Sequence, residues 1–338
     1  MYTIISIISF IFVFGLLVFF HEFGHFAVAK LNNIKVHKFA LGMGPKLLSY
    51  QGRETEYSLR ILPIGGYVHM EGEDEVSDDE RSFSSKTPLQ RMAVLAAGPI
   101  MNIVLAVILL TIIAFNFGAP VNTIDKITED SPAEIVGLKA GDEIIKINEV
   151  DINSWDDIVE TIGENEDRIL KVNVLRNGEK LSFDITPKLD KKTNRYLIGI
   201  TPAMEKSVIK SVKSAVGNVF LVMKQIFEFL FNFLRGQGSA EDVVGPIGMF
   251  HYVGEAASIS IFSLLSLAAV ISINLAIINI LPFPALDGGR IIFAIIEMIK
   301  GSPVDPEKEG FVHMIGFVVL IALMVLVVYK DIIRFNLL

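Results

Sequence analysis

Phe20-His21-Glu22-Phe23-Gly24-His25-Phe26 places three ionisable side chains at the end of an apolar run of membrane length. Residues 4–20 contain no charged side chain. In a helix, His21 and His25 are four residues apart and project from the same face. Two neutral imidazoles can bind Zn²⁺, and Glu22 can accept a proton from a water molecule at the metal. This His-Glu-x-x-His pattern predicts a metal site on the first helix.

The motif has two interpretations, a metal site or a helix end without metal, and its position in an apolar run favours the metal site. Histidine and glutamate are common on soluble helices, so the five-residue pattern alone has modest specificity. Ionisable groups at or below a membrane surface are costly and usually functional. The alternative is a helix end that reaches the polar headgroups and binds no metal.

The composition is that of a polytopic membrane protein with at least one soluble domain. Of 338 residues, 51% are hydrophobic and 20% are charged, and the mean hydropathy is +0.52. The net charge of -8 does not indicate the positively charged surface that nucleic-acid-binding proteins have. The chain has no cysteine, so metal ligands must come from histidine, aspartate or glutamate. The N-terminus lacks a basic leader, so we expect its apolar run to be a retained span.

Four apolar runs approach the length of about 20 residues that crosses a bilayer. They are residues 4–28, 92–117, 261–281 and 311–329. The connection at 30–91 is rich in lysine and arginine, whereas no basic residue precedes the first run. The positive-inside rule places the N-terminus outside and this loop in the cytoplasm, with the metal motif toward the cytoplasmic half. Lys330 and Arg334, after the last run, argue weakly against this orientation.

The basic loop contains strand patterns. Residues 56–62 alternate with period two, and residues 46–50 could pair with them. Pro63-Ile64-Gly65-Gly66 breaks the pattern, and residues 67–70 form the next short strand. We expect a small β-meander beside the metal helix, although a plain surface hairpin is equally consistent with the pattern.

Residues 119–202 have the composition of a small soluble domain. Ser131 is expected to cap a short helix, with a proline following it, and residues 154–162 are expected to form a second helix. Arg176-Asn177-Gly178 is expected to turn a hairpin between residues 169–175 and 180–186.

The same region resembles a bacterial PDZ domain through Ser131-Pro132-Ala133 and Gly137-Leu138-Lys139-Ala140-Gly141-Asp142-Glu143-Ile144. PDZ domains add a peptide strand to a sheet edge and hold its terminal carboxylate. The resemblance implies a C-terminal peptide as ligand and a carboxylate loop at Leu197, Ile198, Gly199 and Ile200. A domain that only blocks access to the membrane site is an equal alternative.

Residues 207–234 are apolar but carry lysines on similar helical phases, namely Lys210, Lys213 and Lys224. An amphipathic helix on the outer surface fits this pattern better than a span.

A second ionisable group inside an apolar run is Asp287, within Asn279-Ile280-Leu281-Pro282-Phe283-Pro284-Ala285-Leu286-Asp287-Gly288-Gly289-Arg290. Zinc bound by His-Glu-x-x-His needs a third protein ligand. Two prolines break the helix at membrane depth, where irregular backbone must be buried or line a wet cavity. Asp-Gly-Gly predicts a tight turn that aims the carboxylate. An interfacial turn with a capping aspartate is the alternative.

Together these motifs resemble the site-2 protease family of intramembrane zinc metalloproteases, in its bacterial PDZ-containing (RseP-type) branch. The resemblance also rests on Gly65-Gly66-Tyr67-Val68 and Ala97-Gly98-Pro99-x-x-Asn102. It implies one Zn²⁺ per chain, with His21, His25 and Asp287 as ligands and Glu22 as general base. It further implies substrate-binding roles for Asn279, Pro282, Gly66, Tyr67 and Val68. Larger members have two PDZ domains, whereas this chain has room for one.

The implied fold is a mainly α-helical polytopic membrane protein with four transmembrane segments, a membrane-associated β-loop and one inserted α+β PDZ domain. Its expected parts are a first core half (1–118), the PDZ domain (119–202), a surface helix and linker (203–260), and a second core half (261–338). The implied substrates are single-span membrane proteins, such as anti-sigma factors or remnant signal peptides, in the bacterial cytoplasmic membrane. Two alternatives are a non-catalytic PDZ scaffold and a membrane-anchored metallopeptidase for soluble peptides.

Overall fold

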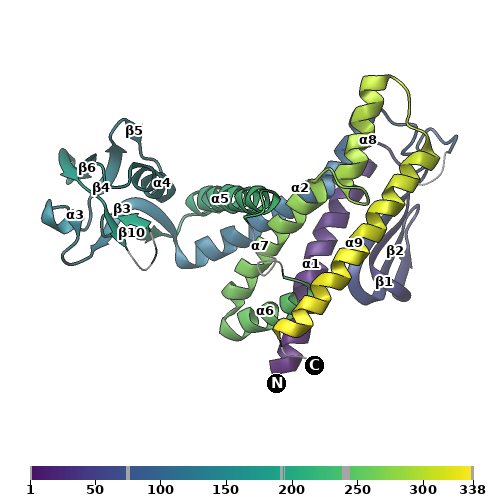
Figure 1. Cartoon of the computed structure of the whole chain (residues 1–338), viewed down its shortest axis with the longest axis horizontal. Coiled ribbons are helices and arrows are strands. Elements are labelled where there is room, and N and C mark those ends of the chain that lie inside the picture. Colours follow the sequence, from purple (N-terminus) through teal and green to yellow (C-terminus); the bar gives the residue numbers. More distant parts are fainter. Residues whose placement is uncertain (1, 74–76, 191–192, 194, 238–243, 336–338) are drawn as a thin grey trace. The chain divides into compact units, whose positions relative to one another are not determined.

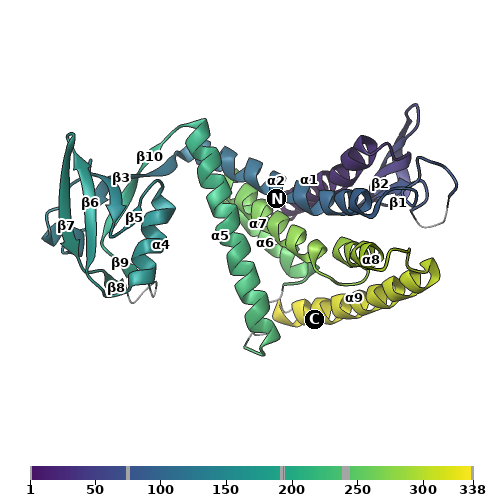
Figure 2. The ribbon, with the colours of Figure 1, turned by 90° about the horizontal axis from the view of Figure 1, so that it is seen from above.

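The computed structural model describes residues 2–73, 77–190, 193, 195–237 and 244–335, which fold as two compact units (Figure 1 and Figure 2). One unit comprises Met1–Leu109 with Val219–Leu338, and the other comprises Leu110–Asn218. The first is mainly helical with one β-sheet, and the second is rich in β-strands. The chain therefore leaves the helical unit and later returns to it.

Among the described residues, five helices have the length and composition needed to cross a membrane. They are α1 (Tyr2–Leu31), α2 (Pro88–Phe117), α5 (Val208–Leu234), α7 (Ile261–Ile280) and α9 (Pro306–Arg334). Four of them contain the four apolar runs of the sequence. The fifth, α5, is the helix expected to lie on the membrane surface.

The β-sheet consists of two long strands, β1 (Val36–Gln51) and β2 (Glu56–Met70), which bend so that four arms lie side by side. Residues 36–41 pair with residues 66–70 on one side and with residues 56–59 on the other. Residues 46–51 pair with the far side of residues 56–60. The expected partners at 46–50 and 56–62 do pair. The inner arm at residues 36–41 is not apparent from the sequence pattern, and the expected break before Tyr67 is a bend within β2.

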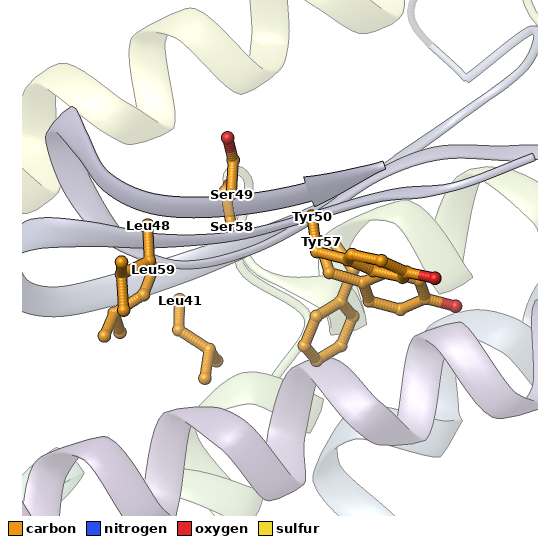
Figure 3. Close-up of a pocket in the computed structure, with 8 residues that line it drawn as sticks. Leu41, Leu48, Ser49, Tyr50, Tyr57, Ser58 and Leu59 are labelled. Atoms are coloured by element: carbon orange, nitrogen blue, oxygen red, sulfur yellow. The ribbon is translucent and has the colours of Figure 1, made fainter. Parts of the chain in front are cut away.

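One face of this sheet holds an apolar groove of about 300 Å³ (Figure 3). Leu41, Leu48 and Leu59 point into it, while Ser49 points to the opposite side of the sheet. Phe26 of α1 packs against two aromatic residues that line the groove, with its ring centroid 5.4 Å from that of Phe39 and 6.0 Å from that of Tyr57. The apolar sheet face therefore packs along α1, the helix that carries the metal motif.

A helix precedes α7 where the sequence analysis expected only a linker. α6 (Pro246–Ile259) packs against α1. Asp331 of α9 is 1% exposed, and its carboxylate accepts hydrogen bonds from the N–H groups of Gly245 (3.2 Å) and Gly248 (2.8 Å). A carboxylate at a helix N-terminus is stabilised by the helix dipole. This contact, which no local pattern reveals, ties the start of α6 to the end of α9.

The second unit contains the expected strands and helices, together with short strands that the sequence pattern did not predict. The expected elements are β3 (Ala119–Ile127), α3 (Pro132–Ile135), β4 (Glu143–Ile147), α4 (Trp155–Asn165), β6 (Leu170–Arg176) and β7 (Glu179–Ile185), and the short strands are β5 (Val150–Asp151), β8 (Lys188–Asp190), β9 (Arg195–Leu197) and β10 (Ile200–Glu205). The main sheet has the order β10-β3-β4-β6-β7, so β10 lies at one end. Ser131 caps α3, and Asn177 and Gly178 turn the β6–β7 hairpin with positive φ, as predicted. Ser154 caps α4.

An ion pair with a buried carboxylate links the start of β4 to the end of β6 in this unit. The Asp142 carboxylate is fully buried and accepts hydrogen bonds from Nε (2.6 Å) and Nη2 (2.7 Å) of Arg176. Burial alone raises the pKa of Asp142, but the hydrogen bonds from Arg176 and from the Lys139 N–H outweigh it and hold the pKa below its ordinary value.

Candidate metal centre

α1 and α2 approach so closely at the two histidines that only glycine fits between them. A Cβ at Gly24 would lie 2.2 Å from the carbonyl oxygen of Ala97. A Cβ at Gly98 would lie 2.3 Å from Nε2 of His25 and 2.8 Å from Cε1 of His21. The bare backbone of α2 therefore forms one wall of the site.

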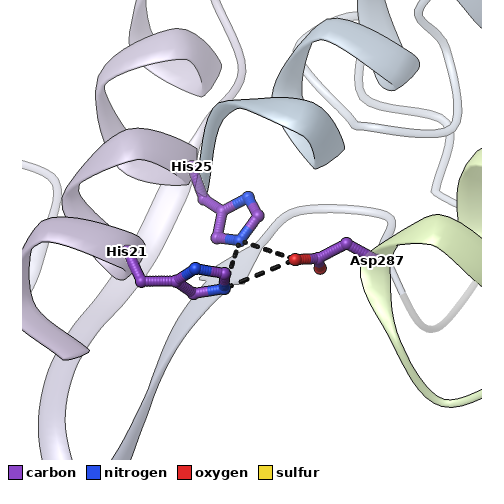
Figure 4. A group of neighbouring side chains, drawn as sticks. All are labelled: His21, His25 and Asp287. Carbon is purple, nitrogen blue, oxygen red and sulfur yellow. Dashed lines mark hydrogen bonds and ion pairs between the residues drawn. The ribbon is translucent and has the colours of Figure 1, made fainter. Parts of the chain in front are cut away.

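Three candidate ligands converge on one point (Figure 4). His21 and His25 project from one face of α1, as their spacing predicts, and Asp287 reaches them from the start of α8 (Asp287–Lys300). The two Nε2 atoms are 3.2 Å apart, and Oδ2 of Asp287 lies 3.3 Å from that of His21 and 3.6 Å from that of His25.

These distances fit a tetrahedral metal ion. Metal bonds of about 2.0–2.1 Å at tetrahedral angles separate neighbouring ligand atoms by roughly 3.3 Å. Oδ2 of Asp287 is buried and has no hydrogen-bond partner among the described residues. A cation between the three atoms would satisfy this oxygen and use the lone pairs of both imidazoles. The donor set of two nitrogens and one carboxylate oxygen suits zinc.

Two glycines after Asp287 determine where the carboxylate points. A Cβ at Gly288 would lie 2.2 Å from the carbonyl oxygen of Leu281, and one at Gly289 would lie 2.4 Å from that of Phe283. The predicted tight turn is wrong, because these residues form the first turn of α8, which folds back onto the end of α7. Glycine is a poor helix former, but here the close backbone contact requires it.

Ion pairs hold α8 against its neighbours. Arg290 lies 2.5 Å from the carboxylate of Glu73, in the segment that follows β2. Arg91 of α2 pairs with Glu297. The helix that begins with Asp287 is thus fixed to the sheet segment and to α2.

Backbone and side-chain groups of α2 orient both imidazoles. Nδ1 of His25 lies 2.8 Å from the carbonyl oxygen of Val94, which can only accept a hydrogen bond. Nδ1 therefore carries the proton, and Nε2 is left to bind a metal. Nδ1 of His21 lies 3.2 Å from Nδ2 of Asn102, and Oδ1 of the same amide has no partner within the described parts of the chain, so the amide is free to be placed the other way round. For His21 to bind through Nε2, the amide must present its oxygen to the Nδ1 proton.

Substitution of Asn102 tests this orientation. Asn102→Leu is expected to weaken zinc affinity by about 10- to 100-fold, as loss of an outer hydrogen bond does elsewhere. Asn102→Asp keeps an acceptor for the Nδ1 proton and is expected to retain most of the affinity. Competition with a chromophoric chelator measures both. Equal affinities in Asn102→Leu and the unmodified chain would contradict the assignment.

Glu22 lies where α1 meets the edge arm of the sheet. A Cβ at Gly66 would lie 2.8 Å from Cγ of Glu22, so this strand packs directly against the Glu22 side chain. The hydroxyl of Tyr67 accepts a hydrogen bond of 2.5 Å from Arg60, and Val68 is buried in the core between the sheet and the helices. Of the three sheet residues expected at the site, Gly66 touches the candidate base.

The remaining expected site residues lie in two places. Asn279 is in the last turn of α7, and Pro282 stands just beyond its end, five residues before Asp287. The expected carboxylate loop, Leu197 to Ile200, joins β9 to β10 in the other unit. There the carbonyl oxygens of Ile198 and Gly199 accept backbone hydrogen bonds from the Thr128–Ala133 region.

Comparison with known proteins identifies the family. The model of peptidase family M50 matches residues 9–323. The chain belongs to peptidase family M50. A Clostridium acetobutylicum relative, named as a zinc metalloprotease, is 41% identical over 97% of both chains. The zinc metalloprotease RasP of Geobacillus kaustophilus is 34% identical over 98% of this chain and 99% of its own. The regulator of sigma-W protease RasP of Bacillus subtilis is 33% identical over 97% of this chain and 98% of its own.

Membership of family M50 confirms the expected family, the enzyme class and zinc as the cofactor. Among solved structures, the PDZ domain of an SdrC-like protein from Listeria monocytogenes matches 25% of this chain and 87% of its own, with 28% identity and a TM-score of 0.22.

Two groups at the candidate metal centre were not recognised from the sequence as parts of the site. Val94 orients His25 through a backbone carbonyl, which has no sequence signature. Glu73 follows an expected strand and is one of several acidic residues there, so nothing local distinguishes it as the partner of Arg290.

Proposed function

We propose that this chain hydrolyses peptide bonds within transmembrane segments of single-span membrane proteins. The observation that carries the proposal is the convergence of His21, His25 and Asp287, with Glu22 beside them. The two histidines and Glu22 lie on α1, which has membrane-spanning length, and Asp287 begins α8 shortly after the end of α7, another helix of that length. A site for soluble peptides has no need to sit among such helices. A scaffold has no need for a carboxylate between two ligand histidines.

Two groups carry out the proposed hydrolysis, a bound zinc ion and the Glu22 carboxylate. A bound zinc ion supplies a Lewis acid for the scissile carbonyl and lowers the pKa of water. Glu22 accepts the proton of the attacking water and returns it to the leaving amine. His21, His25 and Asp287 hold the ion, and Val94 and Asn102 keep the two imidazoles in orientation.

The substrate must be extended before it can be cut, because the carbonyls of a helix are internally bonded. We infer that an unwound substrate adds as a strand to the edge arm of the sheet at residues 66–70. The contact between Gly66 and Glu22 supports this, since a strand added there would run past the base. Tyr67 and Val68 belong to the same arm, and Asn279 and Pro282 would confine the strand from the side of α7.

For the membrane arrangement we infer four spans, α1, α2, α7 and α9, with α5 on the outer surface and the N-terminus outside. The far arm of the sheet supports a membrane-associated β-loop, because Leu47, Leu48 and Tyr50 are 60%, 67% and 71% exposed. Exposed apolar side chains at this density indicate contact with lipid. The domain boundaries expected at 118, 202 and 260 are retained in this proposal.

The PDZ region is proposed to lie outside the cytoplasm and to select substrates. β10 ends the main sheet, and a peptide strand could pair with it, with its carboxylate at Leu197 to Ile200. Exclusion of untrimmed substrates is the alternative role. A relative is named regulator of sigma-W protease, which makes anti-sigma factors the first substrates to examine.

Asp287→Asn tests the proposed centre. A neutral amide is a weaker ligand than a carboxylate, so we expect the zinc content of the purified full chain to fall well below one per chain and cleavage of a single-span substrate to be lost. Elemental analysis measures the first, and gel electrophoresis measures the second. Glu54→Gln, at a partly exposed ion pair with Lys30 and Arg81, serves as the control. Unchanged zinc in Asp287→Asn would remove this residue from the ligand set.

A further inference from the structure

Ala285, two residues before Asp287, has an unusual backbone conformation. Its φ is +73°, in the left-handed region that residues with a Cβ rarely adopt. Such conformations persist only where surrounding contacts hold them, and they cluster at functional sites. The loop that delivers Asp287 is therefore strained at one identifiable position.

The contact that holds Ala285 comes from α9. The Ala285 N–H donates a hydrogen bond of 2.8 Å to Nδ1 of His313. Because Nδ1 accepts, the proton of the neutral ring lies on Nε2, on the side of Glu309, whose carboxylate is 3.7 Å away. The imidazole side chain is only 16% exposed.

Two further contacts seat α9 against this loop. A Cβ at Gly316, one helical turn after His313, would lie 2.5 Å from the carbonyl oxygen of Pro284. Phe293 of α8 packs on the imidazole, with ring centroids 5.4 Å apart. His313 thus lies between the loop before Asp287 and the helix after it.

We propose that His313 is a positioning residue for the metal centre, which holds Ala285 left-handed so that Asp287 faces the two histidines. The inference rests on the proposed role of Asp287 as a ligand. His313 does not touch the metal position. It acts through the backbone, so its loss should displace the carboxylate without removing any ligand.

Two substitutions of His313 separate the hydrogen bond from the packing. His313→Phe keeps an aromatic ring against Phe293 but removes the acceptor. We expect a loss of zinc affinity of about tenfold, the lower end of the effect of outer groups on metal sites. His313→Asn keeps an acceptor near the position of Nδ1 and is expected to stay within about threefold of the unmodified chain. Chelator competition on the full chain in lipid nanodiscs gives both affinities.

The decisive measurement is rescue by glycine. Glycine adopts a left-handed φ without steric cost. We therefore expect His313→Phe combined with Ala285→Gly to recover most of the lost affinity, while Ala285→Gly alone changes it little. A residue needed only for helix packing would show no such rescue.

Two controls keep the outcomes distinct. His251→Phe makes the same chemical change at another histidine, which packs on Phe335 at 4.9 Å, and should leave zinc affinity unchanged. Asp287→Asn reports on the ligand itself, so unchanged affinity there would refute the proposed centre. If Asp287→Asn weakens zinc binding as expected, two results would overturn the positioning role of His313. One is an unaltered zinc affinity in His313→Phe, and the other is a loss of affinity that Ala285→Gly does not reverse.

Discussion

Glu22→Gln is expected to abolish cleavage while the chain keeps its zinc. Glutamine has nearly the same size as glutamate but cannot accept the proton of the attacking water. General-base catalysis typically contributes about 10²- to 10⁴-fold to the rate, and the base here also serves the leaving amine, so the larger value is expected. Glu22 is not among the three converging ligands, so zinc content should stay at one per chain.

The measurement is a time course with a purified single-span substrate in detergent or nanodiscs, together with elemental analysis of the same sample. Glu54→Gln, which neutralises a carboxylate away from the centre, should cut normally. Cleavage by Glu22→Gln at more than about a tenth of the normal rate would exclude Glu22 as the base.

Gly98→Ala should disrupt the centre from the opposite wall, although it changes no polar group. The added methyl would lie 2.3 Å from Nε2 of His25, which is the atom expected to bind the metal. Either α2 moves away from α1 or the imidazole rotates, and both separate the ligands. We expect zinc affinity to fall by at least 100-fold, comparable to the loss of a ligand, and activity to fall with it.

Gly15→Ala is the matched control for this change. It adds the same methyl to α1, at a position where no atom lies within 4 Å of the new Cβ. Alanine also favours helix, so this variant should be folded, loaded with zinc and active. Normal zinc affinity in Gly98→Ala would show that the two helices separate more easily than their close contact implies.

The ligand trio could be selected from the sequence because ionisable side chains inside apolar runs are rare and costly. His21, His25 and Asp287 were the ones that required an explanation, and the structure brings them together. Six of the elements in residues 119–205, namely β3, α3, β4, α4, β6 and β7, were predictable as well, because a serine cap, a proline and an Asn-Gly turn are local signals. Each of these predictions depended on chemistry that neighbouring residues display.

Other features escaped because their partners are distant backbone groups. His313 stands near the start of an ordinary helix, and nothing nearby indicates that it accepts a hydrogen bond from Ala285. The consecutive glycines after Asp287 read as a turn, because their helical conformation depends on the carbonyls that end α7. Likewise α6 lacks a distinctive pattern, and its cap, Asp331, lies more than 80 residues away.

The proposed zinc ligands are far apart along the chain, so they are synthesised at different times. About 260 residues lie between the histidines and Asp287, and two protein ligands are fewer than a catalytic zinc centre needs. At roughly 20 residues per second, a ribosome spends about 13 s between these points. During this interval the histidines are already in the membrane, among other newly inserted chains, without a working centre. On the proposed ligand set, the zinc centre therefore cannot form before residue 287 has been synthesised.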